Sequence, residues 1–517
     1  MKGTVDIKIP YLTSLSFLQN QQQVIDNMRS EGSLTKSITH ISSGLRVINA
    51  KEDLVNFEFE DRFDDIKKQG LNKTIPNTSK AIQNTNDALS AVQVAKTSLN
   101  EYMDVLGYMK ELAEKSSDSN TDNSDRKTFQ EEMIVLQERL RNISDETTFK
   151  GRQLINGNYK FQEIQIGEAV GQTMSISMKS TRTDQIGLHQ LTSEGGINDA
   201  GNFRSALYAS IDNGISELDN FTIQGFMGAE LIDIPDYSDA KQIAELINEK
   251  TELTGVEATA KTYAKIYNLS KTGDVSFILH GASEVEISAT IESIDDLTPL
   301  YEDFELKSPL SQITPKLSTD KDAIYLYAEN GENIGIEDFD NTLFPTLIKF
   351  AGLQPDGETI AGTENTLISD IQGSILVGGY VDFNSDEPFL LFTGSGTALF
   401  YENNTTQFPG LNALDYIDIS SMENASDALE IINNSNTYIE RIQSELQAYE
   451  SGFQSIINRL EAASDQEVNS RHSIVDLDMA EETLKLSRAT IHVQSQNALI
   501  TQANRLIPEY SLFLVRQ

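Results

Sequence analysis

Strict apolar periodicity near both ends of the chain is the feature that most limits how it can fold. Apolar residues recur at alternating spacings of four and three residues over 88–113, over 129–143 and again over 439–463. This is the a/d spacing of helices that pack together as in a coiled coil, an ordinary amphipathic helix in a bundle being the alternative. Each segment has one narrow stripe to cover. The three segments therefore predict one antiparallel bundle formed by both ends of the chain.

Prolines and acidic residues concentrate between these ends. Eight of the 11 prolines fall within 191–420, where 39 acidic residues stand against 10 basic ones. Proline breaks helices, so long helices are expected in the flanks and not in the centre. We therefore predict an α+β fold in which N- and C-terminal helices form a coiled-coil-like bundle and the centre is a mostly β outer insert.

Strands are predicted in this centre at 275–279, 285–291, 324–327 and 375–383, where apolar and polar residues alternate. A helix over 238–248 is predicted from Ile243, Leu246 and Ile247, which share one face. Ser238 is the N-cap candidate of this helix.

Composition excludes several classes of function. A net charge of −39 argues against a nucleic acid or an anionic membrane as partner. The chain has no cysteine, so disulfides, thiolate metal sites and cysteine nucleophiles are absent. No apolar run approaches the ~18 residues of a membrane span, and the start lacks the apolar region of a Sec-type signal peptide. We expect no membrane insertion, and any export must use another route.

Candidate chemical sites in the centre are incomplete. A zinc peptidase needs a second His one helical turn away, which neither His189 nor His280 has. Segment 382–386 has the oxygen spacing that opens a calcium loop, but Glu387 replaces the turn glycine and Thr393 the final Glu. We predict a solvated acidic turn there, with weak cation binding as the alternative. The sequence predicts no enzyme, no cofactor and no metal site.

The C-terminal segment 474–507 carries two apolar ladders of seven-residue spacing, offset by about 200° around a helix. A helix with apolar stripes on opposite sides must be covered on both sides. We expect the N-terminal helix to cover one side and neighbouring copies of the chain the other; a membrane surface or a buried core helix are the alternatives. The first ladder is Leu477, Leu484, Ile491 and Ala498, and the second is Met479, Leu486, Val493, Ile500 and Ile507. The covering residues expected on the N-terminal helix are Leu12, Leu15, Leu18, Val24, Ile25 and Met28, then Leu34, Ile38 and Ile41.

Several segments at both ends resemble the bacterial flagellin family. They are co-linear with the family's motifs over roughly 5–190 and 425–517. The segments are 42–47, 49–53, 61–63, 84–90, 98–101, 110–113, 137–140 and 148–151, then 474–482, 487–489 and 499–504. Segment 221–258 is similar to the strand–helix–strand module of flagellin outer domains. Segment 54–60 departs from the family pattern, because it is bulkier and more acidic.

This resemblance implies three layers: inner filament-core helices at 1–48 and 474–517, a helical bundle with a small β part at 49–190 and 421–473, and outer domains at 191–420. It implies a structural subunit that self-assembles into the bacterial flagellar filament for swimming. The two ladders, with Leu12, Leu15 and Leu18, would drive polymerisation. A hook–filament junction protein and a flagellin-like adhesin are the alternatives.

Export through the flagellar type III apparatus to the extracellular flagellum follows from the same resemblance. The implied partners are further copies of the chain, an export chaperone on the C-terminal helix, and the filament cap and hook-associated proteins. The family's patch for an animal innate receptor carries over onto Tyr108, Leu112 and Glu132. Tyr108 stands where the family has an arginine, and its c position in the seam predicts that it points outward.

Overall fold

The computed structural model describes residues 9–44, 60–167, 169, 171–194, 202–204, 213–362, 364–369, 371, 373–475 and 478–515. These residues fall into two compact units, one within Met1–Ser90, Gln162–Ile176 and Tyr449–Gln517, the other within Ala91–Phe161 and Ser177–Ala448. Long helices near both ends and a β-rich centre confirm the predicted α+β fold. The three-layer division of the chain stays a prediction.

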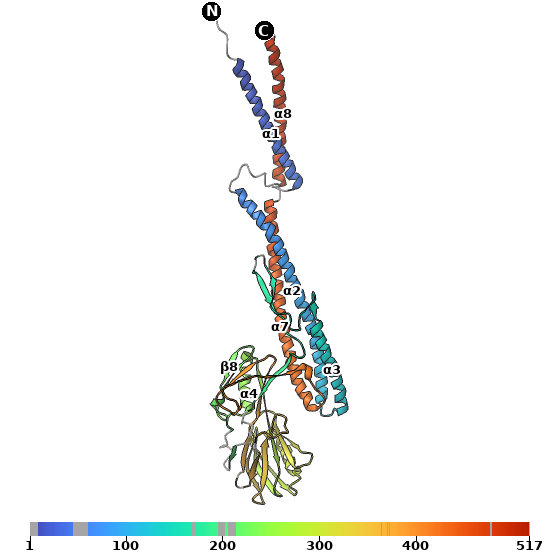
Figure 1. Ribbon diagram of the computed structural model, residues 1–517, viewed down its shortest axis with the longest axis vertical. Helices are drawn as coiled ribbons and strands as arrows, with labels where there is room; N and C mark the ends of the chain where they lie inside the picture. The colour runs from blue at the N-terminus through green and yellow to red at the C-terminus, as the bar shows by residue number, and fades with distance from the viewer. Residues whose placement is uncertain are drawn as a thin grey trace, which may run out of the picture. The chain divides into compact units, whose positions relative to one another are not determined.

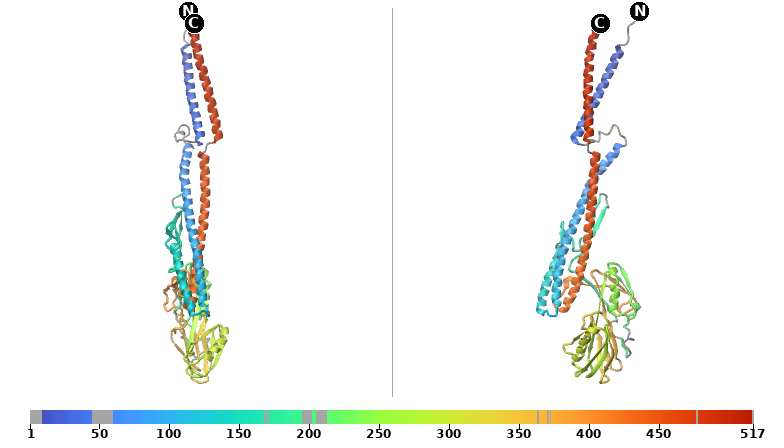
Figure 2. Two further views of the ribbon diagram at one scale, coloured as in Figure 1. Left: turned by 90° about the vertical axis from the view of Figure 1, so that its right-hand side faces the viewer. Right: turned by 180° about the vertical axis from the view of Figure 1, so that it is seen from behind.

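In the first unit, helices α1 (Ile9–Ser43) and α8 (Met479–Val515) lie side by side and run antiparallel (Figures 1 and 2). Two polar pairs align them. Asn27 Nδ2 donates to Asn497 Oδ1 over 3.3 Å, and His40 Nδ1 lies 3.7 Å from Glu482 Oε1. The same unit contains a hairpin of β3 (Gln162–Gln165) and β4 (Thr173–Ile176).

Helices α2 (Glu60–Ser117), α3 (Asn123–Glu146) and α7 (Met422–Val475) form the predicted bundle (Figure 1). Every predicted seam position of α2 is buried, as are five positions of the α7 seam. Gln443 Nε2 of α7 donates to Asn100 Oδ1 of α2 over 2.9 Å beside this seam. The buried α2 positions are Ala88, Val92, Ala95, Leu99, Tyr102, Leu106, Met109 and Ala113, and those of α7 are Ile439, Ile442, Leu446, Phe453 and Leu460.

Two glutamines of α3 hold the chain where it returns from the centre to the bundle. Gln137 Nε2 donates to the carbonyl oxygens of Leu414 and Ile417, over 3.0 and 3.4 Å. Gln130 Oε1 accepts a hydrogen bond from the backbone N–H of Ile419 over 2.6 Å. Helix α7 begins three residues later, so these bonds fix its start against α3.

The centre of the chain forms antiparallel sheets, described strand by strand in spatial order. The five-stranded sheet contains β11 (Val285–Ile291), β10 (Gly273–His280), β14 (Ile334–Asn341), β17 (Ser374–Val377) and β6 (Asn202–Arg204). The eight-stranded sheet contains β12 (Thr314–Leu317), β13 (Ala323–Ala328), β9 (Glu257–Tyr267), β18 (Tyr380–Ser385), β5 (Gly187–Thr192) and β21 (Gly410–Ala413), with β15 (Leu347–Gly352) and β16 (Asn365–Ile368) branching from β9. The four-stranded sheet contains β20 (Thr406–Gln407), β19 (Leu390–Thr393), β7 (Phe221–Gln224) and β8 (Ala229–Ile232).

Shorter elements lie both after α3 and in the centre. Strands β1 (Thr148–Phe149) and β2 (Arg152–Gln153) form a hairpin after α3. The helices are α4 (Ala240–Asn248), α5 (Thr251–Thr254) and α6 (Thr298–Ser311), with 3₁₀ turns η3 (Glu217–Asp219) and η4 (Leu414–Tyr416).

Strand β9 connects two hydrophobic cores. It pairs with β13 along one edge; along the other edge its first half pairs with β18 and its second half with β15. Ala258 lies in one core together with Ile243 of α4. Ile266 lies in the other core together with Phe350 of β15. The side chains of one face of a single strand therefore fill both cores, as alternation along a strand allows.

Three predicted strands are confirmed as β10, β11 and β13, whereas two local predictions are wrong. The run 375–383 is interrupted between β17 and β18, where a Cβ on Gly379 would lie 2.3 Å from Thr262 Oγ1. The N-cap of α4 is Asp239 and not Ser238. Gln242 stands three residues after Asp239 and returns a side-chain bond to its N–H, a capping box that Ser238 cannot form with the same partner.

Candidate assembly and recognition surfaces

The two ladders of α8 have different surroundings. Leu486, Val493 and Ile500 are half-buried, while Leu484 and Ile491 of the other ladder are 53% and 64% exposed. Among the described residues, the two ladders therefore differ in exposure from Leu484 onward, and the cover by neighbouring copies stays a prediction. Ala498 is also exposed, and Met479 is exposed at the start of the helix. Leu477 lies outside the described residues, and nothing is described of the Ile507 side chain.

The expected contribution of α1 to this cover is wrong in its central turns. Val24, Ile25, Met28 and Ile38 are exposed, Met28 by 66%, instead of packing against α8. Leu34 and Ile41 are half-buried. The side chains of Leu12, Leu15 and Leu18 lie outside those that the structure describes. Four of the expected apolar residues of α1 are thus exposed, as Leu484 and Ile491 of α8 are.

Polar residues occupy the contact between α1 and α8. Ser37 and His40 of α1 and Glu482 of α8 are buried, and Ala489 of α8 is buried as well. Lys485 Nζ lies 3.5 Å from Glu482 Oε2 at the edge of this contact. Buried polar pairs of this kind specify the register of paired helices at a cost in stability. Sequence reasoning missed this polar seam because it followed apolar residues alone.

Tyr108, Leu112 and Glu132 line one groove of about 390 Å³ between α2 and α3. Tyr108 is 61% exposed, as its predicted c position requires, and Glu132 is exposed. The g position of Leu112 in the same seam predicts a place on the rim. That prediction is wrong, because Leu112 is buried. Glu111, from the run 107–112 that resembles the family's patch, also lines the groove, together with Lys115, Val135 and Leu136, which the resemblance did not indicate.

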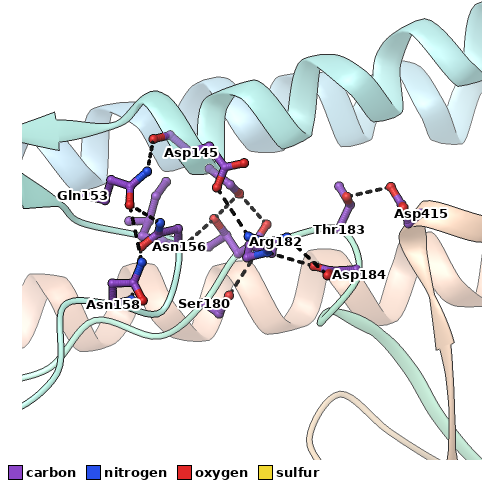
Figure 3. Close-up of polar contacts among 12 residues, drawn as sticks. Asp145, Gln153, Asn156, Asn158, Ser180, Arg182, Thr183, Asp184 and Asp415 are labelled. Atoms are coloured by element: carbon purple, nitrogen blue, oxygen red, sulfur yellow. Dashed lines mark hydrogen bonds and ion pairs between the residues drawn. The ribbon is translucent and has the colours of Figure 1, made fainter.

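A polar network joins the end of α3 to the segments that follow it (Figure 3). Gln153 Nε2 donates to the carbonyl oxygen of Asp145 over 2.9 Å, and Gln153 Oε1 accepts from Asn156 over 2.6 Å. Arg182 Nε donates to Asp184 over 3.0 Å, and its Nη1 lies 3.8 Å from Asp145. The network holds the β1–β2 hairpin and the segment that leads into the centre against the bundle.

Asp415 ties the two ends of the insert together. Its carboxylate accepts from Thr183 Oγ1 over 2.8 Å and from Arg141 of α3 over 2.5 Å. Burial alone would raise the pKa of Asp415, but the hydrogen bonds from Arg141 and Thr183 outweigh it and lower that pKa. Strand β5, which leads the chain into the centre, pairs with β21, which leads it back. The chain therefore leaves and re-enters the bundle through neighbouring strands.

Arg441 of α7 forms a second joint between bundle and insert. Its guanidinium lies 3.1 Å from Asp386, 2.8 Å from Glu387 and 4.5 Å from the centroid of the Phe226 ring. Burial raises the pKa of Asp386, against the opposing effect of Arg441. The predicted solvated acidic turn at 382–386 is therefore wrong. Residues 382–385 belong to strand β18, and the carboxylate of Asp386 forms an ion pair with Arg441.

The described residues contain neither a metal centre nor a membrane span. There, no group of three or more His, Asp and Glu side chains could hold a metal ion. Within the same ranges no helix combines the length and the apolar character needed to cross a bilayer.

Comparison with known proteins points to one family. The model of the bacterial flagellin N-terminal helical region matches residues 16–160, and that of the C-terminal helical region matches 429–508. B-type flagellin of Pseudomonas aeruginosa is 26% identical over 512 residues, covering 98% of this chain and 99% of that protein. Flagellin B of Helicobacter pylori is 22% identical over 524 residues, covering 95% and 97%.

Solved structures show weaker similarity. FliC from Burkholderia pseudomallei aligns over 70% of this chain and 98% of its own, with 13% identity and a TM-score of 0.28. FlgL from Xanthomonas campestris aligns over 77% and 97%, with 12% identity and a TM-score of 0.31. Both TM-scores are too low to carry an argument about the role of this chain. The family matches at both ends, with similarity to flagellins over almost the full length, show that the chain belongs to the bacterial flagellin family.

Proposed function

We propose that this chain is the repeating subunit of a flagellar filament and that the outward faces of α1 and α8 drive its polymerisation. Flagellins are structural subunits of the extracellular filament, and they form polymers. One observation carries the finer proposal: both helices of the terminal pair turn apolar side chains outward, Val24 and Met28 on α1 and Leu484 and Ile491 on α8. Burying such side chains is the main favourable term in protein association. Because flagellins form polymers, the partners that bury these side chains are the α1–α8 pairs of further copies of the chain.

The test is assembly of purified monomer after addition of salt, followed by negative-stain microscopy. A filament subunit grows into long tubes, whereas a hook–filament junction protein, the alternative, forms no long polymer. A chain without residues 477–517 should remain a folded monomer, because it lacks the open ladder of α8. Long filaments from that truncated chain would refute the role of the terminal helices.

Export through the flagellar type III apparatus is part of the proposal, with a chaperone that covers α8 beforehand. Leu484, Ile491 and Leu499 are exposed and follow one another at spacings of seven and eight residues. This spacing suits an amphipathic helix that lies in a hydrophobic groove. Hydrogen exchange of the monomer with and without the flagellar export chaperone should show protection of residues 478–502. Protection confined to other helices would contradict this assignment. The filament cap and hook-associated proteins remain proposed partners at the filament ends.

The groove beside Tyr108 is proposed as the altered counterpart of the family's receptor patch. A phenol lacks the charge and the donor fork of a guanidinium. Truncating a buried charged contact typically costs about 2–5 kcal/mol. We expect weak activation of the animal flagellin receptor by the monomer and partial recovery in Tyr108→Arg. A reporter-cell assay compares the two proteins, with Tyr416→Arg as a control at another exposed tyrosine. Full potency of the unmodified monomer would show that Tyr108 has no influence.

A further inference from the structure

One face of the eight-stranded sheet combines tyrosine and lysine side chains. Along β9, Tyr263, Lys265 and Tyr267 occupy alternate positions and are half-buried, while Ala264 and Ile266 between them are buried in the core. Because side chains alternate between the faces of a strand, the first three share the outer face. At its start this face lies against α7, since Lys261 and Tyr263 line one pocket with Asp427 and Glu430; Lys265 and Tyr267 do not line that pocket.

Neighbouring strands extend the same face. In the strand register, Tyr325 of β13 is opposite Lys265, and Tyr327 is opposite Tyr263. Lys316 of the edge strand β12 is opposite Tyr325. We call this set the tyrosine–lysine face: Tyr263, Lys265, Tyr267, Lys316, Tyr325 and Tyr327. Its residues are neighbours on the adjacent strands β12, β13 and β9, so they lie on one continuous face of the sheet.

The side chains of the tyrosine–lysine face contact one another. Lys265 Nζ lies 4.8 Å from the ring centroid of Tyr325 and 5.2 Å from that of Tyr267. The rings of Tyr263 and Tyr327 meet edge to face, with centroids 5.4 Å apart. These contacts hold the rings and the ammonium group in place before any ligand arrives, which lowers the ordering cost of binding.

Positive charge on this face contrasts with the acidity of the region around it. Four of the ten Lys and Arg residues in 191–420 lie on the outer face of this sheet: Lys261, Lys265, Lys316 and Lys349. Lys349 is paired with Glu364. Among the described residues, Lys265 and Lys316 have no carboxylate within ion-pair distance, although the same region holds 39 acidic residues. Within those residues neither ammonium group is held in an ion pair, although Lys349, Tyr267 and, more weakly, Lys265 lower the pKa of the nearby Glu364 carboxylate.

The phenol groups of Tyr263 and Tyr327 keep their protons at neutral pH. Burial, followed by the neighbouring Tyr325 and acidic residues, raises the pKa of Tyr327 to about 12. Burial and nearby acidic groups also raise the pKa of Tyr263. The face thus offers aromatic rings, hydroxyl donors and cations side by side.

We propose that the tyrosine–lysine face binds an acidic carbohydrate, with sugar rings against the tyrosines and a carboxylate at Lys265 and Lys316. The C–H groups of a pyranose suit the negative face of an aromatic ring, and a carboxylate suits an ammonium group. A nucleic acid, which carries one charge per ~1.7 Å of duplex, brings far more negative charge to a region that already has a net charge of −29. A sugar chain with isolated carboxylates avoids most of that repulsion.

The test is retention of labelled full-length monomer on an array of immobilised glycans. The array carries uronate- and sialate-bearing oligosaccharides, their neutral parents and a ten-residue oligothymidylate. We expect retention on acidic glycans that falls with added salt. Lys265→Gln and Tyr325→Ala should each weaken retention by at least about tenfold, while Tyr325→Phe keeps most of it. Lys321→Gln and Tyr416→Ala, which remove an exposed lysine and an exposed tyrosine elsewhere, should have no effect.

Lys265 and Tyr325 also support the sheet, so thermal unfolding is measured for every variant. Lys316→Gln, on the edge strand, supplies a variant expected to keep the fold and still bind less. The proposal is overturned if no acidic glycan retains the monomer, or if folded Lys265→Gln and Lys316→Gln bind as well as the unmodified chain. Retention on the oligothymidylate alone, or self-association through this face in sedimentation, also overturns it. Filament growth is scored separately, so either proposal can fail without the other.

Discussion

Replacing Leu484 and Ile491 together with serine tests the assembly role of α8 most directly. The two side chains are 53% and 64% exposed, so roughly half of each remains to be buried by a neighbouring copy. Complete burial of such a side chain contributes about 1.5–3 kcal/mol. Scaled by the exposed fractions, the pair should contribute about 2–3.5 kcal/mol to the addition of each subunit. The critical concentration for polymerisation should therefore rise about 30- to 300-fold.

Sedimentation of polymer from monomer over a range of total concentrations measures that critical concentration. The matched control is Leu306→Ser with Leu310→Ser in α6, which removes two exposed apolar side chains one helical turn apart in the insert. This control should leave the critical concentration unchanged. Thermal unfolding of the bundle should be the same in all three proteins. An unchanged critical concentration in the α8 variant would refute the reasoning, as would an equal rise in the control.

Three further outcomes test the joints of the insert. Replacing residues 195–408 with a Gly/Ser linker keeps β5 and β21 and should leave assembly intact but less dependent on salt, because charge repulsion is screened over about 8–10 Å; a chain that stays monomeric in sedimentation at every salt concentration contradicts this. The pKa of Asp415 in the folded chain lies below its ordinary value. The contacts of its carboxylate therefore stabilise the fold at neutral pH, and this stabilisation is lost as the pH falls through the folded-state pKa. Thermal denaturation of Asp415→Asn should show a loss of about 1 kcal/mol at neutral pH and none in strong acid, and an equal loss at both would exclude the ionised pair as its source. Arg441→Met should lower the free energy of unfolding by about 3 kcal/mol, because it leaves the Asp386 carboxylate buried and unpaired, and Asp386→Asn in addition should restore part of that loss in denaturant titration.

The bundle could be predicted because its information is local and repetitive. From Ala88 to Ala113 every position on one stripe is apolar, and every one of them is buried. Such a stripe has one way to be covered, so periodicity alone identifies both the helix and its packed side. The same reasoning places Tyr108 on the outside.

The terminal helices could be predicted only in part because two kinds of partner compete for their apolar residues. The residues of α1 were expected to cover α8, yet Met28 and Ile38 point outward while Ser37 and His40 face α8. Hydrophobicity indicates that a side chain will be covered, but not whether the cover is intramolecular. The pairing of Asp386 with Arg441 was also beyond sequence reasoning, since 55 residues separate them and no local pattern marks the contact.

A helix pair with polar pairs in its contact and exposed apolar side chains on both helices has consequences for the kinetics of growth. In a lone chain, the polar pairs of His40 with Glu482 and Asn27 with Asn497 stabilise α1 and α8 less than well-packed apolar residues would. A few chains that meet in solution leave most of their apolar faces uncovered, so nucleation is slow. At the end of an existing polymer, the faces of several subunits are already arranged to receive the next chain, and elongation is fast. Growth should therefore show a lag that short filament seeds remove, which confines new polymer to ends that already exist.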